Sequence, residues 1–421
     1  MKNLLDEFKK STFEDWTAQA VKDLKGKDFN ETLLWKPYEG FEVAPYLTEN
    51  KVDDGQILTI QSVQKKEGNW LNLPKIIFEN EKISSDKIKN FFKNGADGVV
   101  LDILENPTID FSKLLHGIKL SDTPIFFISN STKVISELKK FINYKMKGGL
   151  MFDAVSFYFH QIPISKNYFE DLATTIHQSL DSPSFHTVGI DCSEFHNAGA
   201  NAVQELAFGI SSAVTFLDKL TDLGLDAQTI AQKIFFNVSV GTNYFMEIAK
   251  LRALRVLWNR ILQSYNLPNS AVYILANNSV YFDAAQSPHT NILRASTEAM
   301  SAVMGGCDAL SLHAFNATFE QPDEFSERIA MNISTIFKEE AHLDKVADSS
   351  AGSYYIENLT IELVNASWKL FLEIEEMGGY LLACESGYIK EQLDNSRKTR
   401  QANIENGSEI RVGVNKYQEK S

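Results

Sequence analysis

Short apolar runs alternate with helical segments over most of this 421-residue chain, and this alternation constrains the fold more than any other feature. Between residues 240 and 316 the order reads helix, strand, helix, strand. Because each connection is long enough for a right-handed crossover, the repeated units predict an α/β fold with parallel strands. The predicted strands are Gly98–Ile103, Pro124–Ser129, Ala154–Phe159, Thr187–Cys192, Ile234–Ser239, Val272–Ala276, Ala309–His313 and Lys345–Asp348.

Eight such units in a row are the requirement of a closed (β/α)8 TIM barrel. An open doubly wound sheet usually carries a glycine-rich turn after its first strand, whereas Asp102–Pro107 contains no glycine. The sequence therefore predicts an α/β barrel over residues 84–360. It also predicts an N-terminal extension of helix and short strands at 1–83, and C-terminal helices with a tail at 361–421.

Charge and cysteine content narrow the function classes. The formal net charge of −14 argues against a nucleic-acid partner or an anionic membrane surface. The three cysteines are far apart in sequence and lack zinc-site spacing, which indicates buried thiols in a reducing compartment. No targeting segment is visible, and no apolar run approaches the roughly 20 residues of a membrane helix. We expect a cytoplasmic protein.

Polar side chains gather where the predicted strands end, and in a barrel this is the end that carries chemistry. Glu194 beside His313 would suit acid–base work, because a carboxylate orients an imidazole. His160, His196 and Asp191 are candidate metal ligands, but their spacing lacks the compact pattern of dedicated sites, so we expect no metal. Each residue also has a plain structural interpretation as a loop cap. The full set is Asp102, Glu105, Ser129, Asn130, His160, Asp191, Glu194, His196, Asn237, Asn277, Asn278, His313 and Asn316.

The small, polar segment Asp348–Tyr355 has two interpretations. Its backbone amides, placed before a helix, would bind a phosphate group. It would equally serve as a tight connection between a strand and a helix, and spacing does not separate the two.

Several segments together resemble one known family, the methylmalonyl-CoA mutases. The resemblance covers most of the chain, in family order. It implies a barrel that binds an acyl-CoA along its axis, and a separate flavodoxin-like domain that brings adenosylcobalamin to the barrel mouth for a radical rearrangement. The matching segments are Leu24–Lys27, Glu39–Gly40, Asn197–Ala200, Gln204–Ala207, Asn243–Ala253, Leu257–Trp258, Asn291–Ala299, Met304–Gly306, Ser311–His313, Glu324–Ala330, Asp348–Tyr355 and Gly413–Tyr417.

The departures from the family pattern fall on its catalytic positions. The resemblance places Glu194 where catalytic members carry a His, and Asn197 where they carry a Glu. At the end of the sixth strand Leu275 replaces another His, and Asn277 replaces a Gln. The Tyr-, Arg- and Gly-rich stretch that wraps the CoA chain has no counterpart after Tyr46. We also expect the cobalamin domain, with its Asp-x-His-x-x-Gly motif, to be absent.

These departures resemble the small, beta subunit of heterodimeric mutases. The resemblance implies a non-catalytic partner that stabilises a catalytic large subunit, with adenosylcobalamin carried by that large subunit and none bound by this chain. No catalytic residue is expected, and Glu194, Asn277 and His313 would form a degenerate pocket. Lys233 would be a residual CoA contact. The alternative is an acyl-CoA mutase barrel with an altered substrate pocket, served by a separate cobalamin-binding polypeptide.

Overall fold

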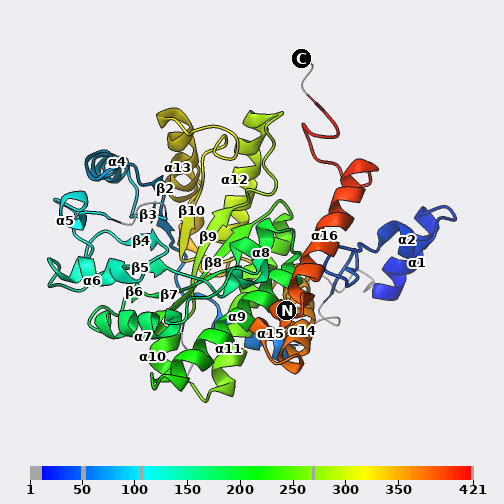
Figure 1. The fold of residues 1–421 in the computed structure, drawn as a ribbon. Coiled ribbons are helices and arrows are strands. Elements are labelled where there is room, and N and C mark those ends of the chain that lie inside the picture. The colour runs from blue at the N-terminus through cyan, green and yellow to red at the C-terminus, as the bar shows by residue number, and fades with distance from the viewer. Residues whose placement is uncertain (1–11, 49–53, 105–107, 268–270, 419–421) are drawn as a thin grey trace, which may run out of the picture.

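The computed structural model describes residues 12–48, 54–104, 108–267 and 271–418 (Figure 1). Parallel strands lie at the centre and helices surround them, so the α/β class is confirmed. The strands form two five-stranded sheets, in the orders β1-β10-β9-β8-β7 and β2-β3-β4-β5-β6. Their bounds are β1 Leu71–Asn72, β2 Lys75–Ile77, β3 Val99–Asp102, β4 Ile125–Ile128, β5 Gly148–Met151, β6 Phe185–His186, β7 Val188–Asp191, β8 Ile234–Val240, β9 Tyr273–Asn278 and β10 Ala309–Ser311.

Two continuous segments of chain connect the sheets. In the first, β1 pairs with β10, and β2 pairs with β3 a few residues later. In the second, β6 pairs with β5, and β7 then pairs with β8. Counting each segment as one strand gives eight strands in cyclic order, which is the arrangement of a (β/α)8 fold.

Apolar side chains fill the space enclosed by these strands. One buried cluster takes a residue from almost every strand around the cycle. The Phe126 ring of β4 lies 5.2 Å from the Phe235 ring of β8 and 5.5 Å from the Tyr273 ring of β9, measured between centroids. Strands on opposite sides of the cycle therefore meet through aromatic contacts, as in a packed core rather than a pore. The cluster is Leu73, Val100, Phe126, Met151, Phe235, Leu275 and Ala309.

Six predicted strands are confirmed, and two are wrong. Ala154–Phe159 contains the 3-10 helix η2, Ser156–His160, and the strand lies earlier, at β5. Lys345–Asp348 is not a strand, because the 3-10 helix η3, Leu343–Lys345, ends there and a turn follows. The missing strand is supplied by residues 71–77, inside the predicted N-terminal extension. The three-part division of the chain stays a prediction.

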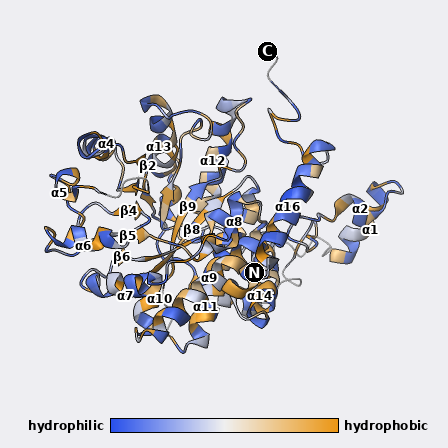
Figure 2. Ribbon diagram, viewed as in Figure 1, coloured by the Kyte–Doolittle hydropathy of each residue, from blue (hydrophilic) through white to orange (hydrophobic). Residues whose placement is uncertain are grey.

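The helices form an outer layer around the strands. In Figure 2 the central strands are mainly hydrophobic, whereas the surrounding helices carry hydrophilic faces outward. No helix in the described ranges combines the length and apolarity needed to cross a membrane. The helices are α1 Phe13–Asp23, α2 Phe29–Leu33, α3 Asp54–Val63, α4 Glu81–Lys93, α5 Phe111–Leu114, α6 Lys133–Lys139, α7 Tyr168–Gln178, α8 Ser193–Asn197, α9 Ala202–Asp222, α10 Ala227–Lys233, α11 Tyr244–Ser264, α12 Pro288–Met304, α13 Glu324–Glu339, α14 Tyr354–Glu376, α15 Tyr380–Glu385 and α16 Tyr388–Glu405.

Candidate functional site

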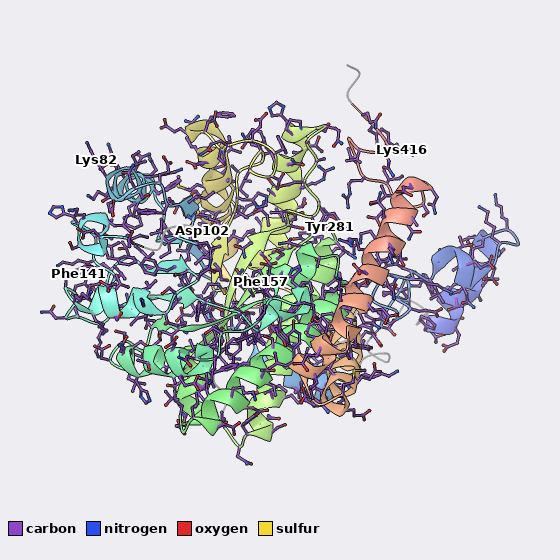
Figure 3. All side chains as sticks on the ribbon, viewed as in Figure 1. Lys82, Asp102, Phe141, Phe157, Tyr281 and Lys416 are labelled. Atoms are coloured by element: carbon purple, nitrogen blue, oxygen red, sulfur yellow. The ribbon has the colours of Figure 1, made fainter. Side chains whose placement is uncertain are left out.

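A cavity of about 690 Å³ opens at the carboxyl ends of the strands, and we call it the barrel-mouth cavity. Its floor is apolar and includes Phe126, Phe235 and Leu275. Figure 3 marks two residues of its wall, Asp102 at the end of β3 and Phe157 in η2. The predicted residues that line it are Asp102, Ser129, Asn130, Asp191, Glu194, Asn237, Asn277, Asn278 and His313.

The three candidates Glu194, Asn277 and His313 therefore face one cavity, although they come from separate parts of the chain. They meet because the carboxyl ends of parallel strands share one end of a barrel. The amide of Asn277 donates to Asn237 Oδ1 at 2.5 Å. Their roles in binding or catalysis stay predictions.

The carboxylate that pairs with His313 is Asp283, not the predicted Glu194. His313 Nε2 lies 2.7 Å from Asp283 Oδ2, and the His313 backbone N–H donates to Asn278 Oδ1 at 2.8 Å. Asp283 follows the β9 strand in an irregular loop, and no periodic pattern in the sequence places it there.

Three carboxyl groups share one wall of the cavity. Burial raises the pKa of Asp153 to about 6 and that of Glu194 to about 7, and the negative charges of neighbouring carboxylates add to both shifts. Burial also raises the pKa of Asp191. Asp191 accepts hydrogen bonds from the Ser193 hydroxyl at 2.5 Å and the Asn237 amide at 2.8 Å. The sequence pattern does not predict Asp153 as a site residue, because Asp153 follows β5 and the predicted strand, Ala154–Phe159, lies later in the chain.

The predicted metal ligands are not brought together. His196 lies outside the barrel-mouth cavity that Asp191 lines, and the His160 ring lies against Phe159, with centroids 4.0 Å apart. Among the described residues, no group of three His, Cys, Asp or Glu side chains is arranged to hold a metal ion. Asn316 makes a 3.4 Å hydrogen bond to Glu320 away from the cavity lining. Glu105 lies outside the described residues.

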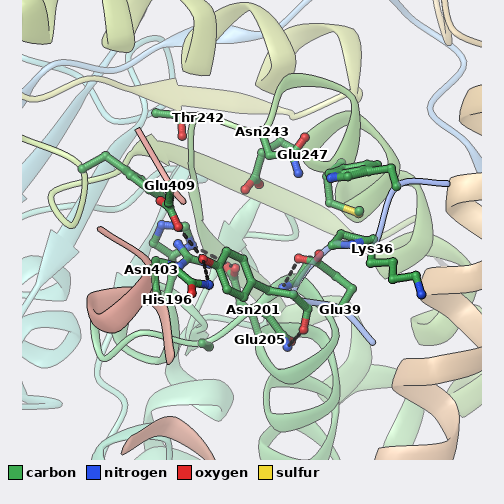
Figure 4. A pocket seen from close by; sticks show the side chains of 18 of the residues that line it. Lys36, Glu39, His196, Asn201, Glu205, Thr242, Asn243, Glu247, Asn403 and Glu409 are labelled. Atoms are coloured by element: carbon green, nitrogen blue, oxygen red, sulfur yellow. Dashed lines mark hydrogen bonds and ion pairs between the residues drawn. The ribbon is translucent and has the colours of Figure 1, made fainter. Parts of the chain in front are cut away.

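A second cavity, of about 440 Å³, lies beside the barrel (Figure 4). It is lined by residues 35–39, by α8 and α9, by the start of α11 and by the end of α16 with the residues that follow it. We call it the side cavity. His196 enters it, with Nδ1 3.2 Å from Glu205 Oε2 and Nε2 2.8 Å from the Ser279 hydroxyl.

Behind the side cavity lies a buried ion cluster. Lys250 donates to Glu205 at 2.7 Å, to the Ser239 carbonyl at 2.7 Å, and approaches Glu247 at 2.6 Å. Burial opposes ionisation of Glu205, but Lys250 and His196 outweigh it and lower its pKa. The signal that would have found this cluster is the presence of charged residues inside otherwise apolar helical segments.

Lys233 lies at the opposite end of β8 from the barrel-mouth cavity. Its ammonium donates to the carbonyls of Ser179, Ser182 and Phe185 at 2.8, 2.7 and 3.0 Å. Burial lowers its pKa to about 8. All three protons are used within the fold, so the predicted CoA contact would require these bonds to break.

The segment Asp348–Tyr355 uses its backbone locally. The Gly352 N–H donates to Glu357 Oε1 at 2.9 Å, and Glu357 also pairs with Arg252 at 2.8 Å. Arg252 forms a second ion pair with Asp348. The Glu357 carboxylate thus occupies a backbone N–H that a phosphate would need. This favours the interpretation of the segment as a tight connection over that of a phosphate site.

Comparison with known proteins identifies relatives along most of the chain. The family described as methylmalonyl-CoA mutase matches residues 83–421. The methylmalonyl-CoA mutase small subunit of Porphyromonas gingivalis is 31% identical over 98% of this chain and 71% of its own length. The large subunit of the same organism is 31% identical over 77% of this chain and 47% of its own length. The human mitochondrial methylmalonyl-CoA mutase is 30% identical over 96% of this chain, which spans 60% of that relative.

Proposed function

Because the chain belongs to the methylmalonyl-CoA mutase family, we propose that it is a non-catalytic small subunit of a mutase that interconverts methylmalonyl-CoA and succinyl-CoA. The observation that carries this proposal is the chemistry of the barrel-mouth cavity. Glu194 and Leu275, which stand where the family pattern has histidines, both line it. The Leu275 side chain can make no hydrogen bond, and the Glu194 side chain donates one only when it is protonated. The cavity lacks the two imidazoles of the catalytic pattern.

The filled interior of the barrel supports the same proposal. Phe126, Phe235 and Tyr273 meet across the axis along which the family resemblance would place an acyl-CoA chain. All three are buried or half-buried aromatic side chains. A CoA arm along this axis would have to displace these side chains from a close-packed core, which is unfavourable.

We assign adenosylcobalamin to the partner. The barrel-mouth cavity, at about 690 Å³, is of a size for drug-like molecules, and a corrinoid is larger. No Asp-x-His-x-x-Gly motif occurs in the sequence. Both observations favour the partner as the carrier of the cofactor. The partner we propose is a catalytic large subunit, as the two subunit names from Porphyromonas gingivalis suggest. A cytoplasmic location stays a prediction.

The proposal is tested by comparing the isolated chain with the pair. The chain alone should neither bind adenosylcobalamin tightly nor turn over methylmalonyl-CoA, whereas co-expression with a large subunit should yield an equimolar complex. Spectroscopic titration and size-exclusion chromatography with light scattering are the measurements. Tight cobalamin binding or turnover by the isolated chain would sink the proposal, as would failure of the two chains to associate.

A second candidate function is an acyl-CoA mutase barrel with an altered pocket, served by a cobalamin-binding polypeptide. It is favoured by the meeting of Glu194, Asn277 and His313 in one cavity. Asn277→Ala distinguishes the two candidates in the reconstituted complex. An altered active site predicts a loss of kcat/KM above about tenfold, or about 1.4 kcal/mol. A supporting subunit predicts turnover within about twofold of the unsubstituted complex.

A further inference from the structure

The barrel-mouth cavity carries more negative than positive charge. Asp153, Asp191 and Glu194 lie along one wall: the Asp191 N–H donates to Asp153 Oδ2 at 2.8 Å, and the Asp191 charge raises the pKa of both Asp153 and Glu194. Lys75 is the one Lys or Arg among the described residues that line the cavity, and it pairs with Asp102 at 3.0 Å. The Lys75 charge also acts on Asp191 and Glu194, but this one lysine faces four carboxyl groups.

The three carboxylates differ in how many of their hydrogen-bond acceptor positions are already occupied. Asp153 accepts N–H bonds from Val155, Ser156 and Asp191, each at 2.8 to 2.9 Å. Asp191 is held by Ser193 and Asn237. The Glu194 carboxyl shows no such bond to another described side chain or backbone group, and it faces the cavity. It is therefore the acceptor available to a ligand.

A separate observation points to the same space. Ser311 is 2% exposed, lines the cavity, and its hydroxyl has no hydrogen-bond partner. It lies two residues after Ala309 on β10, and Ala309 belongs to the cluster inside the barrel, so both side chains point inward. The Ser311 hydroxyl is therefore free to bond to a polar group of a ligand or to a water in the cavity.

The rest of the cavity is apolar. Phe126, Phe235 and Leu275 form its floor, and Phe157 and Ile162 contribute to its wall. Its volume of about 690 Å³ lies within the roughly 300–1,000 Å³ of typical small-molecule sites. The cavity thus joins an acidic wall to an apolar floor. An apolar floor beside an acidic wall complements an organic cation that carries an apolar part.

We propose that the barrel-mouth cavity binds a small organic ammonium or guanidinium carried on a short apolar chain. The cationic head lies between Glu194 and Asp191, where it replaces the missing counter-charge. The apolar chain covers Phe126 and Phe235. An anionic acyl group would be repelled by the same wall. This inference goes beyond the subunit proposal and is incompatible with the second candidate function, which places an acyl group in the same cavity.

Three probes with one apolar tail and different charges test the proposal: hexylammonium, 1-hexanol and hexanoate. Calorimetric titration of the intact chain at about pH 8 and physiological salt should show hexylammonium binding at least tenfold more tightly than hexanol, with hexanoate weakest. Equal affinities for all three, tightest binding of hexanoate, or no detectable binding of hexylammonium would each overturn the proposal.

A variant and a pH series locate the head group. Glu194→Gln should weaken hexylammonium binding about tenfold and leave hexanol binding unchanged, because only the charge is removed. The control Glu170→Gln, on the exposed first turn of α7, should change neither. The affinity of the unsubstituted chain should fall about tenfold from about pH 8 to about pH 6, since the pKa of Glu194 is about 7. An unchanged affinity in Glu194→Gln would contradict the assignment.

Discussion

Replacing Lys250 with methionine is expected to lower the free energy of unfolding by about 3–5 kcal/mol. The Lys250 ammonium is about 1% exposed and contacts two carboxylates, Glu205 and Glu247, which are themselves buried. Methionine fills much of the same volume but leaves both carboxylates without their cation. The loss comes from the uncompensated charges that remain rather than from the ion pair alone.

Chemical denaturation at about pH 8 measures this loss. Lys219→Met, at an exposed position on α9, serves as the control and should stay within about 0.5 kcal/mol of the original chain. The lowered pKa of Glu205 contributes stability that is present above its ordinary pKa and is lost as pH falls through the lowered value. Without Lys250 this contribution disappears, so the deficit should shrink in acid. A deficit below about 1 kcal/mol at pH 8 would contradict the described cluster.

Phe235→Ala is expected to cost about 3–5 kcal/mol of unfolding free energy. Phe235 is fully buried, and its ring meets Phe126 edge-on across the barrel axis. An alanine removes the ring and leaves a void that the surrounding strands cannot close, because each is held in register by its neighbours. The void also extends the barrel-mouth cavity downward.

Thermal and denaturant unfolding of this variant should be compared with Phe141→Ala. Phe141 is 42% exposed at the edge of the molecule (Figure 3), so its removal should cost less than about 1 kcal/mol. A similar, small cost for both variants would show that the barrel interior is loosely packed. That outcome would also remove one support for the non-catalytic proposal.

The sequence predicts the strands whose apolar runs are uninterrupted. It does not predict the two strand segments that contain Pro74 or Gly148, because proline and glycine are normally uncommon inside strands. Pro74 separates β1 from β2 and reads as a break. In the structure it lies where pairing passes from β10 to β3, and its carbonyl accepts the Val100 N–H at 3.1 Å. The N–H groups that donate to the β10 side belong to Leu71 and Leu73, so this pairing uses no N–H at position 74.

The second strand that the sequence pattern does not predict is β5, which begins at Gly148. Two consecutive glycines usually indicate a turn. Gly148 has φ of +120°, and a Cβ at that position would lie 2.0 Å from the Ile125 carbonyl oxygen of the neighbouring strand. The close approach of β4 and β5 requires the glycine, and a single sequence does not reveal such a tertiary requirement. The aromatic run Ala154–Phe159 has the composition of a strand and is therefore predicted as one, although most of it forms η2.

The candidate-site residues that follow a correctly predicted strand could be predicted from the sequence. Glu194, Asn277 and His313 follow recognised strands, so their meeting in one cavity follows from the barrel itself. The Asp283 partner of His313 and the ion cluster around Lys250 depend on how loops and outer helices pack. Local pattern carries no information about that packing, and His196 was for this reason placed at the wrong cavity.

The split pairing of residues 71–77 has a consequence for how the chain can be shortened. These residues bridge β10 and β3, whose sequence positions are more than 200 residues apart. The match to the methylmalonyl-CoA mutase family begins at residue 83, after these residues. A fragment cut at that point would keep the whole match over residues 83–421 yet expose two unpaired strand edges, which recruit other chains and cause aggregation. The pairing of β1 with β10 also joins distant parts of the chain, so we expect folding to be slow.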